Sequence, residues 1–468
     1  MFDLLKYKDN VAVITDRNET LTYNQLSAEA DNFIASIPQK GLVFTLCENL
    51  LGSLVGYVAC VNKGIPQVLL DGSKDLELVQ NLIRIYQPEY IWMPTARVGE
   101  IGGNTIFQYQ EYSLQLMEYA EPLGVKEINT ELSVCLTTSG STGSPKLVRL
   151  SEKNLKSNAE SIAEYLRIDE TERPVTVLPM YYSFGLSVIN SHLIKGATIL
   201  LTDKAVMQKD FWSFMKEHKA TSISGVPYTY EMLKRLRIFR MDLPNLRYMT
   251  QAGGKLNKDI AKEYIEYAKA SDKKFFVMYG QTEATARMSY LPWENALDKY
   301  ASIGIAIPGG SFSLIDTDGS EITEVGKDGE LVYRGDNVSL GYAECREDLM
   351  KGDENNGSLK TGDIAQRDED NYYYITGRMK RFVKVWGNRC NLDATEQLCK
   401  AITTSCACAG VDDKITVFVT EDGLDERIKA LLVEKTGFNP RAFEVRKIEA
   451  LPIKTSGKID YPELQKML

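Results

Sequence analysis

Short apolar runs alternate with amphipathic stretches between about residues 130 and 280 of the 468-residue chain. The apolar runs predict strands at residues 132–136, 175–178, 197–202, 221–224, 246–249 and 275–278. Between two of them, Leu155, Ile162 and Leu166 share one helical face, and Ser151 is placed to cap that helix. Residues 259–270 predict another helix. This alternation predicts an α/β fold of doubly wound sheets covered by helices on both faces.

The ends of three predicted strands carry glycine-rich or polar-aromatic turns. These turns are Pro179–Gly185, Thr250–Gly254 and Tyr279–Glu283. Ligands bind beyond the carboxyl ends of strands in such sheets, so the three turns are candidates for a common site. The alternative for each turn taken alone is that its glycines only close a tight turn.

Short alternating strands are expected from about residue 310 to 376, which indicates a small β-rich subdomain. Beyond it, a strand at residues 415–419 and a helix at 424–435 predict a separate α+β domain. We therefore expect a large domain over residues 1–379 and a small C-terminal domain over residues 380–468.

Composition excludes several classes of protein. A formal net charge of −9 argues against a nucleic-acid partner, and two histidines disfavour zinc hydrolases. The eight cysteines are scattered and form no C-x-x-C pair, which is typical of free thiols in a reducing compartment. No apolar run approaches the roughly 20 residues that span a bilayer, and the first residues lack a secretory apolar segment. A cytoplasmic location is expected.

The run Thr137–Lys146 is rich in hydroxyl side chains and glycine and ends in lysine. Its backbone amides and hydroxyls suit a polyphosphate. It fails the P-loop pattern, because Pro145 stands at the second glycine position and Leu147 at the hydroxyl position. The alternative is a solvated linker, which the predicted strands on either side disfavour.

This run is the first of eight short sequence blocks along the chain. Their order resembles that of the adenylate-forming superfamily, which includes acyl-CoA synthetases, carrier-protein ligases, peptide-synthetase adenylation domains and beetle luciferases. The blocks are Thr137–Lys146, Leu178–Leu186, Ala252–Gly254, Tyr279–Glu283, Gly329–Tyr342, Thr361–Asp363, Gly377–Gly387 and Pro452–Lys458. The resemblance covers residues 132–458, and Leu21–Leu26 resembles the family's opening block.

The resemblance implies that a carboxylic acid reacts with ATP to give acyl-AMP and pyrophosphate, before a thiol takes the acyl group. It implies phosphate binding by Thr138, Ser139, Gly140, Ser141, Thr142, Gly143 and Lys146. It further implies adenine contacts from Tyr279, Gly280, Gly253 and Gly254, and ribose contacts from Asp363 and Arg378. Thr282 is expected at a phosphate, and Glu283 at Mg²⁺, which prefers carboxylate oxygen.

Three lysines carry the remaining expectations from the resemblance. Lys458 is expected to bridge the carboxylate and the α-phosphate, where negative charge develops. Lys380 marks the hinge about which the small domain rotates, and Lys384 then replaces Lys458 for thioester formation. The basic cluster from Arg378 to Lys384 suits either CoA or an acidic carrier protein, or serves only as a salt-bridged hinge.

The acid pocket departs from the family pattern. Tyr182 stands where a histidine is common in the family. Three roles are open for it: gating the acid pocket, bonding the carboxylate, or packing in the core. Gly185, in the same block, is the second residue expected at the acid pocket. Residues 178–191 contain no Asp or Glu to bind an α-amine, which favours a simple carboxylic acid. CoA and the phosphopantetheine of an acyl or peptidyl carrier protein both remain candidate acceptors.

Three alternatives stay open. One is an amino-acid-adenylating enzyme, and another is a luciferase-like oxidase, for which no residue specifies oxygen chemistry. The third is a non-catalytic nucleotide- or carrier-binding protein on the same fold, since fold alone does not guarantee activity.

Overall fold

The computed structural model describes residues 1–73, 76–120, 127–137, 146–379, 381–386, 388–454 and 459–468. For residues 382, 384, 388, 389 and 391 it describes the backbone alone. The chain divides into two compact units. Unit 1 comprises Met1–Ser311 and Arg334–Leu359, and unit 2 comprises Phe312–Tyr333 and Lys360–Leu468. The predicted boundary at residues 379 and 380 stays a prediction.

The first large sheet of unit 1 has nine described strands in the order β16-β15-β14-β13-β12-β10-β11-β1-β2. In chain order they are β1 (Val11–Thr15), β2 (Thr20–Thr22), β10 (Pro174–Val175), β11 (Ile199–Leu201), β12 (Ser222–Gly225), β13 (Tyr248–Gln251), β14 (Lys274–Tyr279), β15 (Ser289–Tyr290) and β16 (Ile305–Ala306). Neighbours from β1 through β14 pair in parallel, apart from the antiparallel edge pair of β1 and β2.

The second large sheet has eight described strands in the order β19-β9-β8-β4-β3-β5-β7-β6. They are β3 (Val43–Cys47), β4 (Gln67–Asp71), β5 (Tyr90–Pro94), β6 (Asn104–Tyr109), β7 (Tyr112–Leu116), β8 (Leu132–Thr137), β9 (Leu147–Ser151) and β19 (Gly341–Ala343). The strands that flank the predicted phosphate loop, β8 and β9, pair antiparallel. The loop therefore joins two paired strands.

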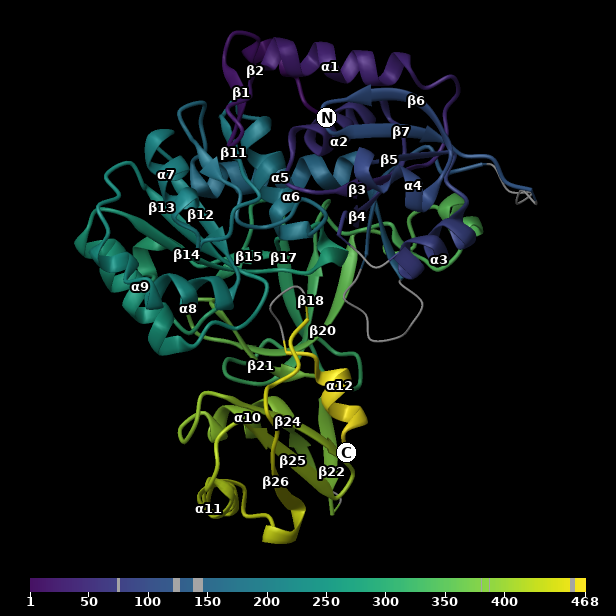
Figure 1. Cartoon of the computed structure of the whole chain (residues 1–468). Helices are drawn as coiled ribbons and strands as arrows, with labels where there is room; N and C mark the ends of the chain where they lie inside the picture. The colour runs from purple at the N-terminus through teal and green to yellow at the C-terminus, as the bar shows by residue number, and fades with distance from the viewer. Residues whose placement is uncertain (74–75, 121–126, 138–145, 380, 387, 455–458) are drawn as a thin grey trace. The chain divides into compact units, whose positions relative to one another are not determined.

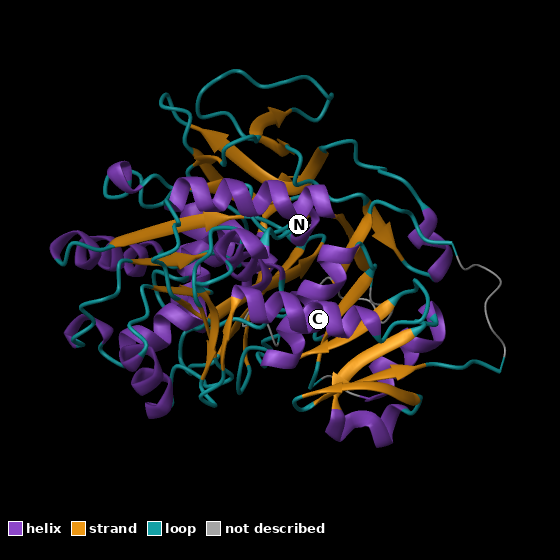
Figure 2. Ribbon diagram, turned by 90° about the horizontal axis from the view of Figure 1, so that it is seen from above, coloured by secondary structure: helices purple, strands orange, loops and turns teal. Residues whose placement is uncertain are grey.

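Helices fill the space between the two sheets and cover their outer faces. They are α1 (Tyr23–Ala35), α2 (Leu51–Lys63), α3 (Leu76–Tyr86), α4 (Val98–Ile101), α5 (Glu152–Leu166), α6 (Ser183–Leu193), α7 (Lys209–Glu217), α8 (Pro227–Arg235) and α9 (Lys258–Ala270). Figure 1 places α5 and α6 between the strands of the two sheets, and Figure 2 shows helices alternating with strands through this unit.

The main core lies between the two sheets. It joins residues from α2, α5 and α6 to residues of β8 and β9 on one side and of β11 on the other. Every residue of α6 is buried, so this helix has no solvent face. The Tyr57 hydroxyl donates to Asn190 Oδ1 at 2.7 Å and ties α2 to α6 inside this core. The position of α6 is thus fixed from both sides.

Unit 2 is built from three small sheets within its described part. Strands β17 (Ser311–Ile315), β18 (Gly329–Arg334), β20 (Ser358–Arg367) and β21 (Tyr373–Arg378) form the first, and β22 (Phe382–Val385) and β23 (Asn388–Asn391) form the second. Strands β24 (Cys406–Val411), β25 (Lys414–Val419) and β26 (Phe443–Lys447) form the third, with α10 (Leu392–Cys399), α11 (Asp425–Thr436) and α12 (Tyr461–Lys466) beside it. These elements include the predicted C-terminal strand and helix.

The α/β fold class predicted from the sequence is confirmed, with differences at strand ends. The strand expected at residues 175–178 contains only Pro174 and Val175. The backbone leaves the ladder there because it turns at Pro179, whose carbonyl accepts from the Tyr182 amide, and enters α6. In the described part of the chain no helix is long and apolar enough to cross a membrane.

The start of α5 provides a test of the local stability. Ser151 caps this helix, accepting from the Asn154 amide at 3.1 Å, while Asn154 Oδ1 accepts from the Ser151 amide at 2.9 Å. We expect Ser151→Ala to lower the free energy of unfolding by about 1 kcal/mol, because the cap acceptor is lost. Urea denaturation measures this, and Ser151→Thr, which keeps the acceptor, is the control. Equal losses in both variants would contradict a capping role.

Candidate functional site

The turn that follows β14 meets the start of α6. Ser183 Oγ, at the first residue of α6, lies 3.2 Å from Thr282 Oγ1. The two residues are 99 positions apart in sequence and belong to two different predicted blocks. One hydroxyl donates to the other, so the pair retains a proton and lone pairs for a ligand. The structure thus joins the predicted phosphate residue Thr282 to the block expected at the acid.

Glu283 connects two further blocks. The Tyr342 hydroxyl of β19 donates to Glu283 Oε1 at 2.9 Å. Burial and the neighbouring carboxylate raise the pKa of Tyr342, so its hydroxyl keeps the donated proton. On the same tyrosine, Lys146 Nζ lies 3.9 Å from the ring centroid, and it also lies 3.4 Å from Glu344 Oε1. Lys146, Glu283 and Tyr342 therefore form one cluster at the end of the predicted phosphate loop.

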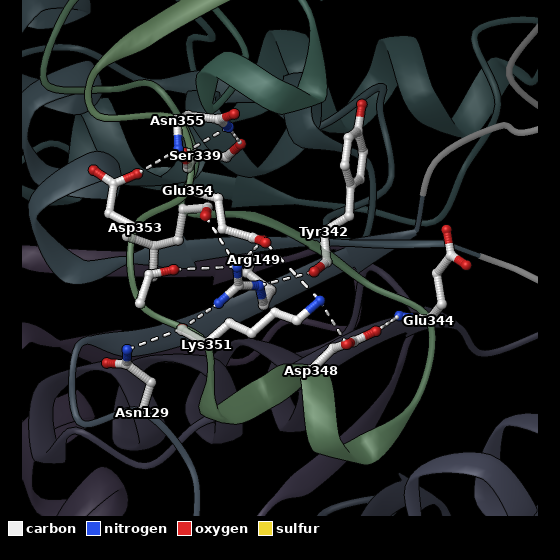
Figure 3. A network of polar contacts seen from close by, with 12 residues as sticks. Asn129, Arg149, Ser339, Tyr342, Glu344, Asp348, Lys351, Asp353, Glu354 and Asn355 are labelled. Carbon is white, nitrogen blue, oxygen red and sulfur yellow. Dashed lines mark hydrogen bonds and ion pairs between the residues drawn. The ribbon is translucent and has the colours of Figure 1, made fainter.

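Arg149 holds Tyr342 in this cluster. Its buried guanidinium donates to the carbonyls of Leu340, Tyr342, Lys351 and Gly352 and to Glu354 Oε2, as Figure 3 shows. The bond to the Tyr342 carbonyl is 3.0 Å and that to Glu354 is 2.6 Å. Five donors in a fixed plane match this set of acceptors, which a lysine cannot do. Arg149 fastens the segment 340–354 to β9.

Close backbone approach explains two of the predicted glycines. A Cβ on Gly280 would lie 1.6 Å from the Ala286 carbonyl oxygen, so the turn after β14 tolerates no side chain there. Gly253 has a φ of +82°, and its Cβ would lie 2.7 Å from the Tyr182 hydroxyl. Tyr182 and Gly253, which were predicted to serve the acid and the adenine, are therefore neighbours.

The other predicted residues of unit 1 lie close to these turns. Tyr279 is half-buried at the end of β14, and its hydroxyl lies 3.4 Å from Gln281 Nε2. The Gly254 carbonyl accepts from Gln251 Nε2 at 2.9 Å. A Cβ on Gly185 would lie 2.2 Å from the Pro179 carbonyl oxygen, which gives this glycine a packing role at the start of α6.

The two residues predicted at the ribose meet on unit 2. Asp363 and Arg378 face each other across β20 and β21, with Arg378 Nε 3.2 Å from Asp363 Oδ1. Asp363 is buried, whereas the Arg378 side chain is 58% exposed. An ionised carboxylate oriented in this way accepts bonds from hydroxyl groups readily.

Several predicted site residues lie outside the described part of the chain. These are the phosphate-loop residues Thr138, Ser139, Gly140, Ser141, Thr142 and Gly143, the hinge residue Lys380 and the lysine Lys458. Lys384 belongs to β22, where the backbone alone is described. Their roles stay predictions.

A small cavity of about 10 Å³ lies between α6 and the strands β12, β13 and β14. It is lined by apolar side chains, by hydroxyl groups, and by His192 and Arg287, none of which was selected from the sequence as part of the acid pocket. The available signal was Arg287 itself, a single cation among small and apolar residues four positions after Glu283. The predicted pocket residues, Tyr182 and Gly185, belong to the same block as the start of α6 but do not line this cavity.

His192 is neutral in this cavity. Its Nδ1 lies 2.7 Å from the Val188 carbonyl and its Nε2 lies 3.0 Å from the Tyr248 hydroxyl. Nδ1–H therefore donates and Nε2 accepts. Burial lowers the pKa of His192 to about 4, so the ring carries no charge near neutral pH.

The Glu283 carboxylate fits one of the ways in which proteins bind Mg²⁺. No group of three or more metal-binding side chains occurs among the described residues, which disfavours an all-protein cage. Mg²⁺ in nucleotide sites is bound through one or two carboxylates together with substrate phosphates. A single carboxylate beside the predicted phosphate loop matches that arrangement.

The chain belongs to the AMP-binding enzyme family. A family profile described as "AMP-binding enzyme" matches residues 3–343, which is most of unit 1. The order of blocks, the fold and this match identify the chain as a member of the adenylate-forming superfamily.

Curated relatives include ligases with different named substrates. The chain is 30% identical over 374 residues to the long-chain-fatty-acid–CoA ligase of Yersinia pestis, with 75% of this chain and 63% of the relative aligned. It is 26% identical over 486 residues to the D-alanine–D-alanyl carrier protein ligase of Streptococcus pyogenes, with 95% and 94% aligned. The chain thus matches less than two thirds of the first relative's length.

Solved structures share the fold. The o-succinylbenzoate CoA synthetase of Bacillus subtilis in complex with its acyl-adenylate superposes with a TM-score of 0.79 at 19% identity, covering 99% of this chain and 97% of that one. ATP-bound MatB from Rhodopseudomonas palustris superposes with a TM-score of 0.79 at 21% identity, covering 99% and 98%.

The Arg149 network predicts a large effect of one substitution. We expect Arg149→Met to lower the free energy of unfolding by about 3–5 kcal/mol, because buried carbonyls lose their donors. The matched control is Lys153→Met, which removes a 2.9 Å ion pair with Asp336 between exposed side chains and should cost no more than about 1 kcal/mol. Urea denaturation of both variants measures this. A loss for Arg149→Met as small as the control's would contradict the proposed anchoring.

His192 predicts a dependence of stability on pH. Its folded pKa of about 4 lies below the unfolded value of about 6.5, so below pH 6.5 the unfolded state binds the proton first. This difference in proton binding has almost no effect on the free energy of unfolding above pH 6.5. It lowers that free energy progressively as the pH falls towards 4. Between pH 7.5 and 5 it amounts to about 2 kcal/mol.

We expect His192→Gln to remove about that much of the pH dependence. The measurement is urea unfolding of both proteins at pH 7.5 and pH 5, compared as a difference of differences. An unchanged pH dependence in the variant would show that His192 takes up its proton equally in both states.

Proposed function

We propose that the protein activates a carboxylic acid with ATP to form acyl-AMP and pyrophosphate, and then transfers the acyl group to a thiol. The observation that carries this proposal is the meeting of four sequence blocks in unit 1. Lys146 lies against Tyr342, Tyr342 bonds Glu283, and the adjacent Thr282 contacts Ser183 at the start of α6. These are blocks that the resemblance connects with phosphate, metal and acid.

Each residue of this cluster has chemistry that suits the first step. A carboxylate is a poor electrophile until its oxygen is joined to a good leaving group, which AMP provides. Lys146 supplies positive charge, and Thr282 and Ser183 supply hydroxyl donors, for the phosphate groups. Glu283 would hold Mg²⁺, which neutralises phosphate charge when bound, and Tyr342 orients that carboxylate.

Residues of unit 2 and the undescribed loop complete the proposed roles. Asp363 and Arg378 would bind the ribose, Tyr279 with Gly253, Gly254 and Gly280 the adenine, and residues 138–143 the phosphates. Lys458 would stabilise charge between the carboxylate and the α-phosphate, and Lys384 would act during thioester formation. A domain of residues 380–468 that turns about Lys380 is the arrangement that lets two lysines act in sequence.

The acyl acceptor is proposed as CoA or the phosphopantetheine of a carrier protein. The curated relatives include ligases of both kinds. Their named acids run from a long-chain fatty acid to D-alanine, so they do not select the acid for this chain. A simple carboxylic acid is favoured here, because residues 178–191 offer no carboxylate to an α-amine.

The test is a screen for acid-dependent pyrophosphate release from ATP and Mg²⁺, with CoA or carrier protein added in a second stage. The acids span two to sixteen carbons and include D-alanine and other amino acids. Release with one or more simple acids is expected. Release with amino acids alone would favour the amino-acid-adenylating alternative, and no release with any acid would favour a non-catalytic nucleotide- or carrier-binding protein.

The two lysines predict separable defects. We expect Lys458→Ala to lower acid-dependent pyrophosphate exchange by at least 100-fold, because the developing charge at the α-phosphate loses its counterion (about 2.7 kcal/mol or more). The same variant should retain thiolysis of supplied acyl-adenylate. We expect the reverse pattern for Lys384→Ala, with exchange retained and thiolysis lost.

The control is Lys466→Ala, which removes an exposed lysine paired with Glu463. It should leave both half-reactions unchanged. Exchange at the unsubstituted rate in Lys458→Ala would refute the role of Lys458, whatever the effect of Lys384→Ala.

A further inference from the structure

Arg287 places a buried cation in the wall of the cavity beside α6. The residue is only 2% exposed, and it lies in the turn that follows Glu283. Its guanidinium stacks on Phe184 at 3.7 Å from the ring centroid. No carboxylate oxygen of the described residues lies within 4.0 Å of it, and its Nε has no hydrogen-bond acceptor. Buried charges in proteins are ordinarily paired.

The groups around Arg287 do not compensate this charge. Its neighbours are the phenols of Tyr165 and Tyr182, and Tyr165 contributes a hydrogen bond. Burial lowers the pKa of Arg287, which is the effect expected where no anion stabilises a guanidinium. Arginine remains protonated in proteins even so. Among the described residues, the cation therefore has no carboxylate counterion.

The rest of the cavity wall is neutral and rich in hydroxyl groups. Both nitrogens of His192 are used by Val188 and Tyr248. Ser224 Oγ and Thr250 Oγ1 lie 2.8 Å apart, so one of the two protons of this pair stays available to a ligand. The cavity lining thus offers an anion one charged group, that of Arg287, and a hydroxyl donor, beside the apolar side chains of Ile162, Leu166, Val188 and Met278.

The cavity lies along α6, the helix whose first residue, Ser183, contacts Thr282. Ser183, Ser187 and Ser191 recur at four-residue spacing and therefore share one face of α6. Ser183 contacts Thr282, and Ser187 and Ser191 line the cavity. Successive serines are four residues apart, which is about 6 Å of rise along the helix. An acid whose carboxylate lay near Thr282 would reach this cavity with a short chain.

We propose that Arg287 pairs with a second anionic group of the acid, so that the substrate is a short dicarboxylic acid or a similar short acid with a distal anion. This inference rests on the proposed function. A volume of about 10 Å³ is close to that of a single water site, so even a short distal anion has to displace neighbouring side chains, and a long alkyl chain would have to displace many more. An ammonium group at the same wall would be repelled by the guanidinium, which disfavours amino acids.

The experiment compares acids matched in length in the pyrophosphate-exchange assay. Succinate is paired with butyrate, and glutarate with pentanoate; palmitate and D-alanine are included. We expect the dicarboxylate of at least one pair to exceed its monocarboxylate by at least about 30-fold in kcat/KM, which is the lower range for a buried charge pair. A monocarboxylate as good as its dicarboxylate would overturn the inference and leave the proposed function intact.

Two variants locate the preference at Arg287. Arg287→Met should lose the preference for the dicarboxylate while monocarboxylate turnover stays the same or rises. Arg287→Lys should retain part of the preference, because it keeps the charge. Equal losses for both acids of a pair in Arg287→Met would indicate a structural role or contact with the reacting carboxylate, and would overturn the inference.

A binding measurement separates this inference from the proposed reaction. In the absence of ATP, millimolar succinate or glutarate should raise the Tm of the unsubstituted protein, whereas butyrate or pentanoate should not, and Arg287→Met should abolish the difference. Such a shift without pyrophosphate exchange would support the anion site and count against the proposed function. No shift and no exchange with any acid would overturn both.

Discussion

The buried guanidinium of Arg149 is the interaction on which the candidate site of unit 1 depends. It stands on β9, a few residues beyond the predicted phosphate loop, and it binds four carbonyls and one carboxylate of the segment 340–354. That segment carries Tyr342, which contacts both Lys146 and Glu283. A planar group with five donors satisfies all these acceptors together, so this side chain adds to the antiparallel pairing of β19 with β9 in fixing the position of Tyr342.

Arg287 is the opposite case in the same unit. Both arginines are buried, but Arg149 is surrounded by acceptors, whereas Arg287 has aromatic rings and hydroxyl groups around it. A fold under selection for stability alone would pair or remove such a charge. Buried charges that no nearby side chain balances occur at functional sites, where a ligand supplies the opposite charge. The contrast between the two arginines separates a structural cation from one suited to a ligand.

The candidate residues of unit 1 stand at a strand end and on a buried helix, whereas those of unit 2 stand on a pair of strands. Thr282 and Glu283 follow β14, which is paired with a strand on each side, and α6 is buried on all sides. Asp363 and Arg378 are paired across two strands of unit 2. A binding constellation built on strands and a buried helix is held more precisely than one built on loops alone.

The sequence by itself determined the α/β class, the positions of most strands, the cap of α5 and the order of blocks that marks the family, because these depend on periodicity and on local chemistry. It also identified the turns after β13 and β14 as candidate sites, since the carboxyl ends of parallel strands share an edge. Only the tertiary structure decided that Ser183 meets Thr282, that Tyr342 meets Glu283, and that no carboxylate of the described residues lies within 4.0 Å of Arg287. Those facts depend on contacts between residues far apart in the chain, and burial and the absence of a partner have no signature in local sequence.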